Sequence, residues 1–570
     1  MRLTDATSCL IVLLLMMNAE RVNAHDLLEM SLEELMQVKV SGATLRHESI
    51  KNVPSAVTVF TAEQIDQMGM DYLYELLGLV PGFQTARGGD YPTEYAYSAR
   101  GRRIGSQSRE VLVLVDGRDV SDPRSFGADA TFNLFPLELI ERVEIIRGPS
   151  SALYGANAVN GTINIITRKN RHKTGLSLGA NNRREGIFQA AKSAGDWHAD
   201  IAIKAFRDTG EEYWLERKSA PRAASADPIE GVYLNGSIGN QATTLRTTSQ
   251  QLKSKQFYIF ESVSNDFNST RQTFNQFELE HQFQSGKNLS SKVSLNYLYT
   301  EQNVQLEILP AGALAAISTP SSNAPLYGKA VIKAQNYKFM SANDWTVTSQ
   351  SSVQFGLSLL KNDEIQATTF NNYNLDQLTL QQYPISYHED FGHSTQIGLG
   401  KVQTAAGVYA QYLGQINADT RITLGGRYDR YDAFGGHLSP RMGIIHQLNE
   451  QQTLKVVYGE AFRAPALAEV GLVNNAYTIG NPDLTYETIK TWELIWQAQW
   501  MHGVVSVDAF HSQYKNPISA GFVGATQTQL NGQGGHTSGI ELEASREFLS
   551  YFLLRATYTR LFELPEESFR

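Results

Sequence analysis

The segment IERVEIIRGPSSALYGANAVNGTINIITR, residues Ile140–Arg168, carries the pattern that decides the fold. Its two ends, IERVEIIR and TINIITR, are short runs rich in β-branched residues, and each predicts a strand. The connection between them is rich in glycine and asparagine. Gly148 and Pro149 predict a sharp turn after the first strand, while Gly155 and Gly161 allow one backbone to approach another closely. Tight packing of backbone is therefore expected here.

The residues around this segment, from about 46 to 170, show a mixed α/β pattern. Thr61 is expected to cap a helix, because Gln64 follows three residues later and can complete a capping box. The other expected elements are strands at Val53–Thr61 and Glu110–Gly117 and a helix at Tyr72–Val80 that stops at Pro81-Gly82.

After about residue 171 the sequence changes to segments in which apolar and polar residues alternate with a period of two. Examples are Phe277–Phe283, Val293–Thr300, Val353–Leu359 and Arg421–Asp429. A soluble β-sandwich also alternates, with its apolar side inward. A membrane barrel is favoured because the segments are about ten residues long, often end in aromatic residues and recur over about 400 residues.

Composition excludes several classes of protein. At 570 residues the chain is too long for one ordinary domain. No run of eighteen apolar residues follows the N-terminus, which excludes a helical membrane protein. The 26 Tyr, 25 Phe and 45 Gly suit extended β architecture, and the net charge of −9 argues against nucleic-acid binding.

The N-terminal 24 residues have the features of a secretory signal peptide. Arg2 provides the positive end, Leu10–Met17 the apolar core and Val22-Asn23-Ala24 the cleavage site. We expect cleavage after Ala24, which removes Cys9, the only cysteine, and leaves no thiol for disulfides, catalysis or metal binding. The alternative is a buried N-terminal helix.

A series of motifs in residues 46–170 resembles the plug of TonB-dependent receptors. They follow the family's order: VPSAVTVFTAEQI, LYELLGLVPGF, Ala99-Arg100-Gly101, VLVLVDGR and Ile140–Arg168. Later motifs, YGEAFRAPALAEV, GNPDLTYETIKTWEL and SGIELEA, are similar to barrel signatures of the same family. The resemblance implies a transmembrane antiparallel β-barrel, of about 22 strands in full-length relatives, with an N-terminal mixed α/β plug domain in its lumen.

The same resemblance divides the chain and implies a function. The expected parts are a signal peptide (1–24), a periplasmic segment (25–45), a plug domain (46–170) and a barrel (171–570). Such receptors bind a scarce substrate outside a Gram-negative cell and import it with proton-motive energy. The implied partners are the TonB complex of the inner membrane and outer-membrane lipid, and the implied assembly is a monomer. No catalytic residue, resident cofactor, metal site or nucleic-acid partner is expected.

Two arginines of the plug are expected to face glutamates of the barrel. Arg100 and Arg147 would lie in the lumen, where burying an unpaired charge is costly. The family pairs its plug arginines with barrel glutamates, and the matching positions are Glu493 and Glu541. The alternative is that these residues form solvated surface ion pairs.

The family also places an extended TonB box before the plug, which binds the energising partner by strand addition. The candidate here is Val38, Lys39, Val40, Ser41 and Gly42, because this segment alternates and precedes the first plug strand. The same residues could instead form the first structural strand of the plug.

Substrate is expected to bind at the plug apex, between the Pro81-Gly82 turn and Arg100. The candidates there and on a second outward loop are Arg87, Tyr91, Tyr95, Tyr97, Arg124 and Phe126. Their combination of cations and aromatic surface suits an anionic, partly aromatic iron chelate. Alternatively, these residues line the barrel wall.

We favour a ferric siderophore as the substrate because it is the commonest cargo of this class. The AFRAP and NPDL motifs resemble boxes of haem receptors, but that subfamily has a histidine between them. Here Ala466–Gly480 contains only Tyr477 as an iron-ligand candidate. Haem, cobalamin and oligosaccharides stay open, as does a surface adhesin; a passive porin would lack the plug. His388-Glu389-Asp390 is read as an exposed loop rather than a metal cluster.

The barrel is expected to be incomplete at its C-terminus. The 400 residues of Arg171–Arg570 accommodate about sixteen to eighteen strands, and the chain ends in a polar segment, Glu563–Arg570. An unpaired edge is therefore expected between the first strand after Arg171 and the strand ending near Phe562.

Overall fold

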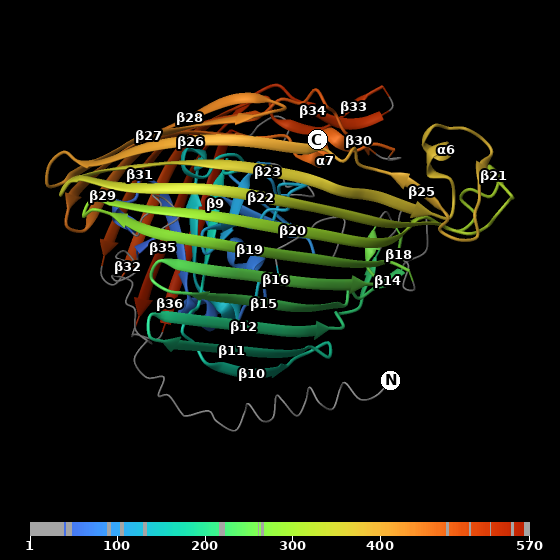
Figure 1. Ribbon diagram of the computed structural model, residues 1–570, viewed down its shortest axis with the longest axis horizontal. Coiled ribbons are helices and arrows are strands. Elements are labelled where there is room, and N and C mark those ends of the chain that lie inside the picture. Colours follow the sequence, from blue (N-terminus) through green and yellow to red (C-terminus); the bar gives the residue numbers. More distant parts are fainter. Residues whose placement is uncertain are drawn as a thin grey trace.

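A computed structural model shows a small α/β domain enclosed by one large, curved antiparallel sheet (Figure 1). The structure describes residues 39–40, 48–87, 93–102, 108–128, 134–215, 223–259, 262–263, 267–474, 478–500, 503–524, 526–548 and 552–563. Among these residues, no helix combines the length and the apolar character needed to cross a membrane.

The inner domain, the plug, is built on a five-stranded sheet in the order β3-β8-β9-β6-β7. Strands β6 and β9 are parallel and the other neighbours are antiparallel. The bounds are β3 (Ala56–Thr61), β6 (Val111–Val115), β7 (Arg118–Asp119), β8 (Ile140–Arg147) and β9 (Gly161–Thr167). The separate pairs are β1 (Lys39–Val40) with β2 (Glu48–Ser49) and β4 (Phe83–Arg87) with β5 (Tyr95–Ala99).

The helices of the plug are short. They are η2 (Ile50–Asn52), α3 (Ala62–Met68), α4 (Leu73–Leu77), η3 (Leu137–Leu139) and α5 (Ser151–Tyr154). The predicted capping box is confirmed, since Thr61 and Gln64 bond reciprocally at the start of α3. The second predicted helix is shorter than expected: α4 spans only Leu73–Leu77, because hydrogen-bonded turns lead into Pro81.

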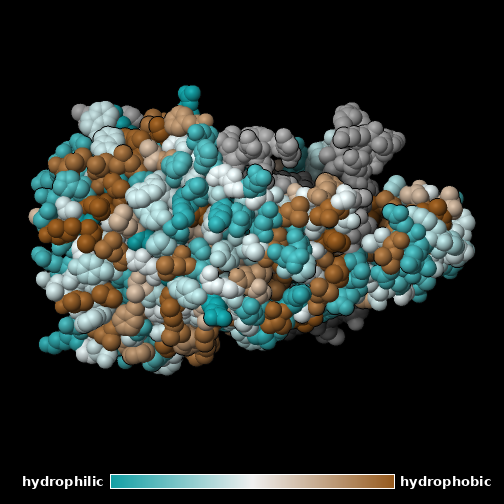
Figure 2. All heavy atoms as spheres, turned by 90° about the horizontal axis from the view of Figure 1, so that it is seen from above, coloured by the Kyte–Doolittle hydropathy of each residue, from teal (hydrophilic) through white to brown (hydrophobic). Residues whose placement is uncertain are grey.

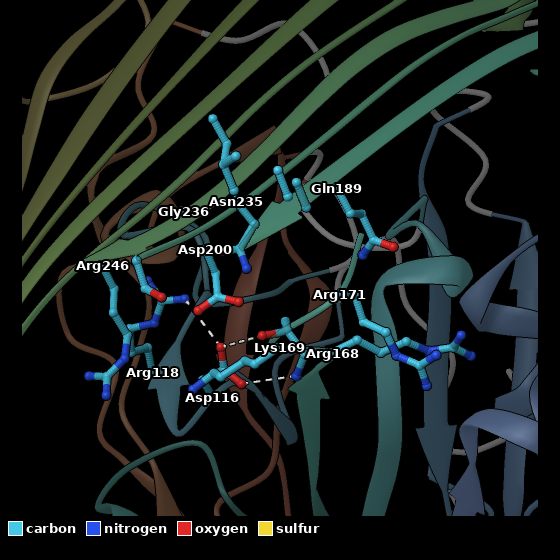
Figure 3. A pocket seen from close by; sticks show the side chains of 15 residues that line it. Asp116, Arg118, Arg168, Lys169, Arg171, Gln189, Asp200, Asn235, Gly236 and Arg246 are labelled. Atoms are coloured by element: carbon cyan, nitrogen blue, oxygen red, sulfur yellow. Dashed lines mark hydrogen bonds and ion pairs between the residues drawn. The ribbon is translucent and has the colours of Figure 1, made fainter. Parts of the chain in front are cut away.

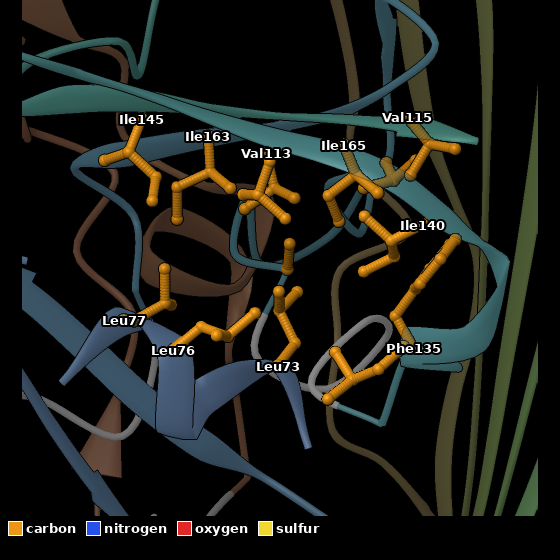
Figure 4. Packing of buried hydrophobic residues seen from close by; sticks show 14 of the residues in the cluster. Leu73, Leu76, Leu77, Val113, Val115, Phe135, Ile140, Ile145, Ile163 and Ile165 are labelled. Carbon is orange, nitrogen blue, oxygen red and sulfur yellow. The ribbon is translucent and has the colours of Figure 1, made fainter. Parts of the chain in front are cut away.

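An apolar core holds the helices of the plug onto its sheet. Leu73, Leu76 and Leu77 of α4 point toward isoleucines and valines of β6, β8 and β9 (Figure 4). Leu76 and Ile165 are fully buried. Burying each such side chain contributes roughly 1.5–3 kcal/mol to stability. The same cluster includes Tyr233 and Phe274 of the barrel, so it also joins the plug to the wall.

The outer sheet has 18 strands, joined almost throughout as antiparallel neighbours in chain order. They are β10 (Lys173–Leu178), β11 (Arg184–Ala194), β12 (Trp197–Asp208), β15 (Ile229–Gly239), β16 (Thr243–Lys255), β19 (Ser269–Ser285), β20 (Leu289–Leu309), β22 (Leu326–Thr348), β23 (Ser351–Asn371), β25 (His393–Gln396), β26 (Val402–Gln415), β27 (Thr420–Tyr431), β28 (Gly435–Asn449), β29 (Gln452–Arg463), β31 (Glu487–Trp500), β32 (Gly503–Lys515), β35 (Gly535–Phe548) and β36 (Phe552–Glu563).

The alternation in these strands separates two faces. On β19, Gln276 and Glu278 are buried inside the sheet, whereas Phe277 and Leu279 are 48% and 45% exposed on its outside. Figure 2 shows hydrophobic side chains on the outer surface, interspersed with polar ones. Apolar groups outside and polar groups inside is the pattern of a membrane barrel, and the opposite of a soluble sandwich.

The two ends of the barrel differ. At the short-turn end, tight hairpins join neighbouring strands, for example between β11 and β12 (Figure 1). At the long-loop end, the connections carry small elements: β13 (Tyr213–Leu215), β14 (Ala223–Ser225), β17 (Tyr258–Ile259), β18 (Ser262–Val263), β21 (Ser318–Thr319), α6 (Leu375–Thr379), β24 (Ile385–Ser386), α7 (Leu467–Gly471), β30 (Thr478–Ile479), β33 (Ile518–Val523) and β34 (Thr526–Asn531).

Strands β10 and β36 are the first and last strands of the 18-stranded sheet. Within the described residues, β10 pairs only with β11 and β36 only with β35. The expected unpaired edge between these strands is therefore present, and the 18 strands match the upper end of the predicted number.

Candidate functional site

A buried ion cluster joins the plug to the barrel wall. The guanidinium of Arg100 lies 2.5 Å from Glu493, 2.9 Å from Asp508 and 3.2 Å from Glu541. Arg147 lies 2.9 Å from Glu541. The predicted ion pairs are thus present, and they are buried instead of solvated. Burial alone favours the neutral form of Arg100, but the surrounding carboxylates raise its pKa well above the usual range.

Sequence reasoning missed Asp508, which no plug or barrel motif contains. Its register partner on the neighbouring strand is Glu541, so both carboxylates face the lumen from one level of the wall. A charged residue at an inward position of the alternating segment Gly503–Lys515 was the available signal.

Two glycines bring the plug backbone onto these carboxylates. Gly148 has φ +85°, and a Cβ there would lie 2.7 Å from a carboxylate oxygen of Glu493. Gly82 has φ +77°, and its Cβ would collide with Glu541. Any other residue at either turn would therefore be strained and would displace the ion cluster.

A second ion network connects the plug to the loop between β29 and β31. Arg102 of the plug bonds to Glu110, also of the plug, at 2.6 Å and to Glu487 of β31. Arg463 of β29 lies 3.4 Å from Glu487. Glu487 thus contacts one arginine of the plug and one arginine of the barrel.

Glu469 of α7 completes this network at the loop. One of its carboxylate oxygens accepts from Arg109 of the plug, and the other accepts from Arg463 and from the backbone N–H of Ala466, each at 2.8 Å. The backbone N–H of Ala468 also donates to the carbonyl oxygen of Arg124. A loop at the mouth of the barrel is thus held directly to the plug.

The charge of Glu469 should make this contact sensitive to acid. Burial alone would raise its pKa, but Arg109 and Arg463 lower it from 4.5 to about 2. Because the folded-state pKa is depressed, the carboxylate stabilises the contact above pH 4.5, and this stabilisation is lost as pH falls toward 2. We expect pepsin cleavage within residues 464–486 to accelerate across that window.

Two variants test this assignment. Relative to cleavage of an unstructured substrate at the same pH, Glu469→Gln should show fast cleavage at the top of the window and little further change, whereas Glu389→Gln, at an exposed position of another loop, should behave as the wild type. Equal pH dependence in the wild type and Glu469→Gln would contradict the role of Glu469.

At the apex, tyrosines stack on one another beside an arginine. The rings of Tyr74 and Tyr95 lie 3.6 Å apart and are nearly parallel, and Tyr72 stacks on Tyr74 at 5.5 Å. The guanidinium of Arg183, in the β10–β11 turn, lies 5.3 Å from the ring of Tyr72 and forms ion pairs with Asp71 at 2.8 Å and Glu185 at 2.6 Å. Burial raises the pKa of Tyr72 to about 12, so its hydroxyl stays protonated at neutral pH. We call Tyr72, Tyr74 and Tyr95 the tyrosine stack.

Of the predicted apex residues, only Tyr95 lies in this stack. Tyr72 and Tyr74 were missed because they lie in the segment that was assigned to a helix and given no binding role. Arg87 ends β4 opposite Tyr95, although only its backbone is described, and Tyr91 lies outside the described residues.

The other predicted apex residues pack against their surroundings. Tyr97 is 4% exposed in the plug core, and Phe126 is 5% exposed against Tyr431 and Phe462 of the barrel. Arg124 lies 2.5 Å from Glu364 of β23. These three residues therefore contact the plug core or the barrel wall, which agrees with the alternative to a substrate-binding role.

The TonB-box candidate is partly described. Lys39 and Val40 pair with Ser49 and Glu48, and Val40 is fully buried. In this conformation the segment is an edge of the plug, as the second interpretation of the sequence allowed. Val38, Ser41 and Gly42 lie outside the described residues.

Two described cavities lie between the plug and the wall, and both are small. One, of about 20 Å³, lies where Asp116 and Arg118 of the plug face Asp200 and Arg246 of the sheet (Figure 3). The other, of about 60 Å³, lies beside Phe126 and Arg427. A water molecule needs about 10–15 Å³, so each cavity holds no more than a few waters. Passage of a chelate through either space requires the plug to move.

Comparison with curated proteins gives relatives under two names. The iron-regulated outer membrane virulence protein of Vibrio cholerae is 26% identical over 515 residues, covering 85% of this chain and 69% of the relative. A vitamin B12 transporter, BtuB, of Vibrio vulnificus is 23% identical over 480 residues, covering 83% and 69%.

Solved structures share the fold. The siderophore receptor PirA from Acinetobacter baumannii matches with a TM-score of 0.67 and 18% identity, over 89% of this chain and 80% of that one. A mutant of the ferric enterobactin receptor PfeA from Pseudomonas aeruginosa matches with a TM-score of 0.67 and 16% identity, over the same shares.

Family profiles match both parts of the molecule. The profile "TonB-dependent Receptor Plug Domain" matches residues 49–162, and "TonB dependent receptor-like, beta-barrel" matches residues 220–567, more than half of the chain. With a plug closing an antiparallel barrel and both profiles in order, the protein belongs to the TonB-dependent receptors of the outer membrane, a family of transporters and not of enzymes.

Proposed function

We propose that the protein binds a ferric siderophore at the long-loop end and imports it with energy delivered by the TonB complex. The observation that carries this proposal is the tyrosine stack beside Arg183 at the plug apex. Flat aromatic faces suit the rings of a planar chelate through stacking. Arg183 is paired with Asp71 and Glu185, so the argument rests on the aromatic faces and not on a free charge. The relative named as iron-regulated and the neighbours named as siderophore receptors support the same substrate class.

Import would require the contacts between plug and barrel to change. Ion pairs join Arg102 and Arg109 of the plug to Glu487 and to Glu469 in the loop of α7. A movement of that loop when substrate binds at the mouth would therefore be transmitted to the plug. Rearrangement of that loop would alter charges buried against the plug, where small displacements are costly. The TonB complex would then pull on the N-terminal segment from the periplasmic side.

The rest of the functional context belongs to the same proposal. We infer that the signal peptide is removed after Ala24 and that the mature protein acts as a monomer in the outer membrane of a Gram-negative bacterium. N-terminal sequencing of protein from the outer-membrane fraction tests this, with His25 as the expected first residue.

The second candidate substrate is cobalamin, because relatives named as vitamin B12 transporters match over most of the chain. We expect cells that produce this receptor to accumulate radiolabelled iron from a ferric siderophore, and to do so only when TonB is present. Catecholate and hydroxamate chelates, haem and cobalamin would be compared in strains lacking their own receptors. TonB-dependent accumulation of cobalamin alone would replace the siderophore assignment, and haem or an oligosaccharide would be tested in the same way.

A variant links this result to the apex. Tyr74→Ala/Tyr95→Ala should weaken chelate binding about tenfold, as loss of about 1.4 kcal/mol would. Tyr412→Ala, which removes a tyrosine from the outer face of β26, is the matched control and should leave binding unchanged. If the two variants weaken chelate binding equally, the tyrosine stack is not part of the binding site.

A further inference from the structure

Near the short-turn end of the barrel, a lysine of the wall contacts the first turn of the plug. Lys455 of β29 is fully buried and lies three residues from the start of that strand. Its ammonium group donates to the carbonyl oxygens of Ile50, Val53 and Ser55, at 2.9, 2.8 and 3.4 Å. In the described part of the chain, all its hydrogen-bond partners are backbone oxygens. Three acceptors match the three N–H donors of an ammonium group, so the contact uses its full bonding capacity.

The neighbouring strand β28 fits against the same turn. Arg441 donates to the carbonyl oxygen of Pro54 at 3.0 Å and to the hydroxyl of Ser55 at 2.9 Å. Two residues along the strand, Gly443 leaves room for the proline, because a Cβ at this glycine would lie 2.5 Å from the Cβ of Pro54. Residues 50–55, which these contacts hold against the wall, are called the anchored turn.

The anchored turn differs from the ion cluster in what the wall recognises. Arg100 and Arg147 contact the wall through carboxylate side chains, whereas Lys455 binds the main chain of the plug. An ammonium group that is buried without acceptors is costly. The turn therefore leaves the wall only when all three bonds to Lys455 break and water replaces them.

The anchored turn lies between the N-terminal segment and the sheet of the plug. Eight residues separate Gly42, the last residue of the box candidate, from Ile50, and fully extended they span about 27 Å. The β1–β2 pairing described above joins two residue pairs of this part of the chain. On the other side of the turn, β3 begins at Ala56, which pairs with Arg147 of the ion cluster. A pull on the N-terminal segment therefore meets the anchored turn before it meets the plug sheet.

We propose that Lys455 is a positioning residue for energy coupling, which anchors residues 50–55 to the wall while the chain before Ile50 is drawn out. A pull on the box candidate first separates β1 from β2 and extends the chain up to the anchored turn. Force reaches β3 and the ion cluster only after the contacts of Lys455 break. The role in transport rests on the proposed function, but the anchor is a property of the receptor alone and is tested without substrate or TonB.

The test measures how often the anchored turn leaves the wall. Once the signal peptide is removed the chain has no cysteine, because Cys9 is its only one, so an introduced cysteine can be labelled alone. Val53→Cys places a thiol at a fully buried position of the turn, and Ile65→Cys places one in the plug core as a second reporter. Each is labelled with N-ethylmaleimide in the purified mature receptor in detergent micelles, and mass spectrometry follows the rate.

Two lysine variants are compared in each reporter background. Lys455→Met keeps an apolar stem and removes the three donors, and Lys204→Met is the matched control, since Lys204 of β12 is also buried and binds the plug, at Glu138 of η3, 2.8 Å away. We expect Lys455→Met to speed labelling at Val53 about tenfold, as loss of about 1.4 kcal/mol would. Labelling at Ile65 should stay unchanged, and Lys204→Met should leave labelling at Val53 at the wild-type rate.

Three labelling results would each overturn the proposal. They are a wild-type rate at Val53 in Lys455→Met, equal acceleration by the two lysine variants, and equal acceleration at Val53 and Ile65, which would show a general loosening of the plug. Pulling single receptors from the N-terminus by atomic force microscopy tests the order of release. The first force peak should follow extension of the chain up to Ile50, and should weaken in Lys455→Met but not in Lys204→Met. A first peak at β3 in the wild type would place the barrier in the plug sheet and contradict the anchor.

Discussion

Replacing Arg100 with methionine is expected to lower the free energy of unfolding by about 3–5 kcal/mol, the usual cost of breaking a buried ion pair from one side. The variant leaves Glu493, Asp508 and Glu541 buried together, and among the described residues Arg147 is the arginine that still forms an ion pair with one of them, Glu541. Methionine fills much of the same space, so the loss reports charge more than volume. Urea titration of the protein in detergent micelles measures it.

Two further variants separate this effect from a general loss of charge. Lys169→Met removes a cation from an exposed position of the plug and should change stability by less than about 0.5 kcal/mol. Adding Asp508→Asn to Arg100→Met removes one uncompensated carboxylate and should recover part of the lost stability. A loss below about 1 kcal/mol for Arg100→Met would show that water reaches the cluster.

Much of the fold could be predicted because the decisive signals are local. Alternation with a period of two identifies strands with one apolar and one polar face, and the capping box at Thr61 depends on residues three positions apart. The type and order of the helices and strands could therefore be predicted from the sequence, whereas the residues at which they begin and end could not. The short helix α4 illustrates this, since its length depends on how the chain turns toward Pro81 and not on its leucines.

The site was predictable only where a motif already specified the partner. Arg100 and Glu541 lie far apart in sequence, and their contact was inferred from motif positions, while the neighbouring Asp508 had no motif to mark it. Whether an aromatic residue of the plug faces a ligand or the core depends on how the plug sits in the barrel. Tyr95 stacks at the apex while Tyr97, two residues away, is buried, and no local pattern separates their roles.

The largest functional effect is expected from the N-terminal segment. Val40→Pro should reduce TonB-dependent uptake to background while leaving chelate binding intact, because proline cannot donate the hydrogen bond that strand addition requires. Val40 is buried and pairs with Glu48 in the described conformation. The experiment therefore needs a control for the loss of this pairing. Proline at position 40 would also disturb that pairing.

Glu48→Pro supplies the control, because it disturbs the same pairing from the opposite strand and leaves the candidate box unchanged. Glu48→Ala accounts for the lost contact with Arg421, 3.3 Å away. If only Val40→Pro abolishes uptake, residues 38–42 act as the strand that the TonB complex binds. If Val40→Pro and Glu48→Pro abolish it equally, the paired edge of the plug is what transport needs, and the box assignment is wrong. Normal uptake by Val40→Pro would move the box elsewhere, with Met30–Met36 as the next segment to test.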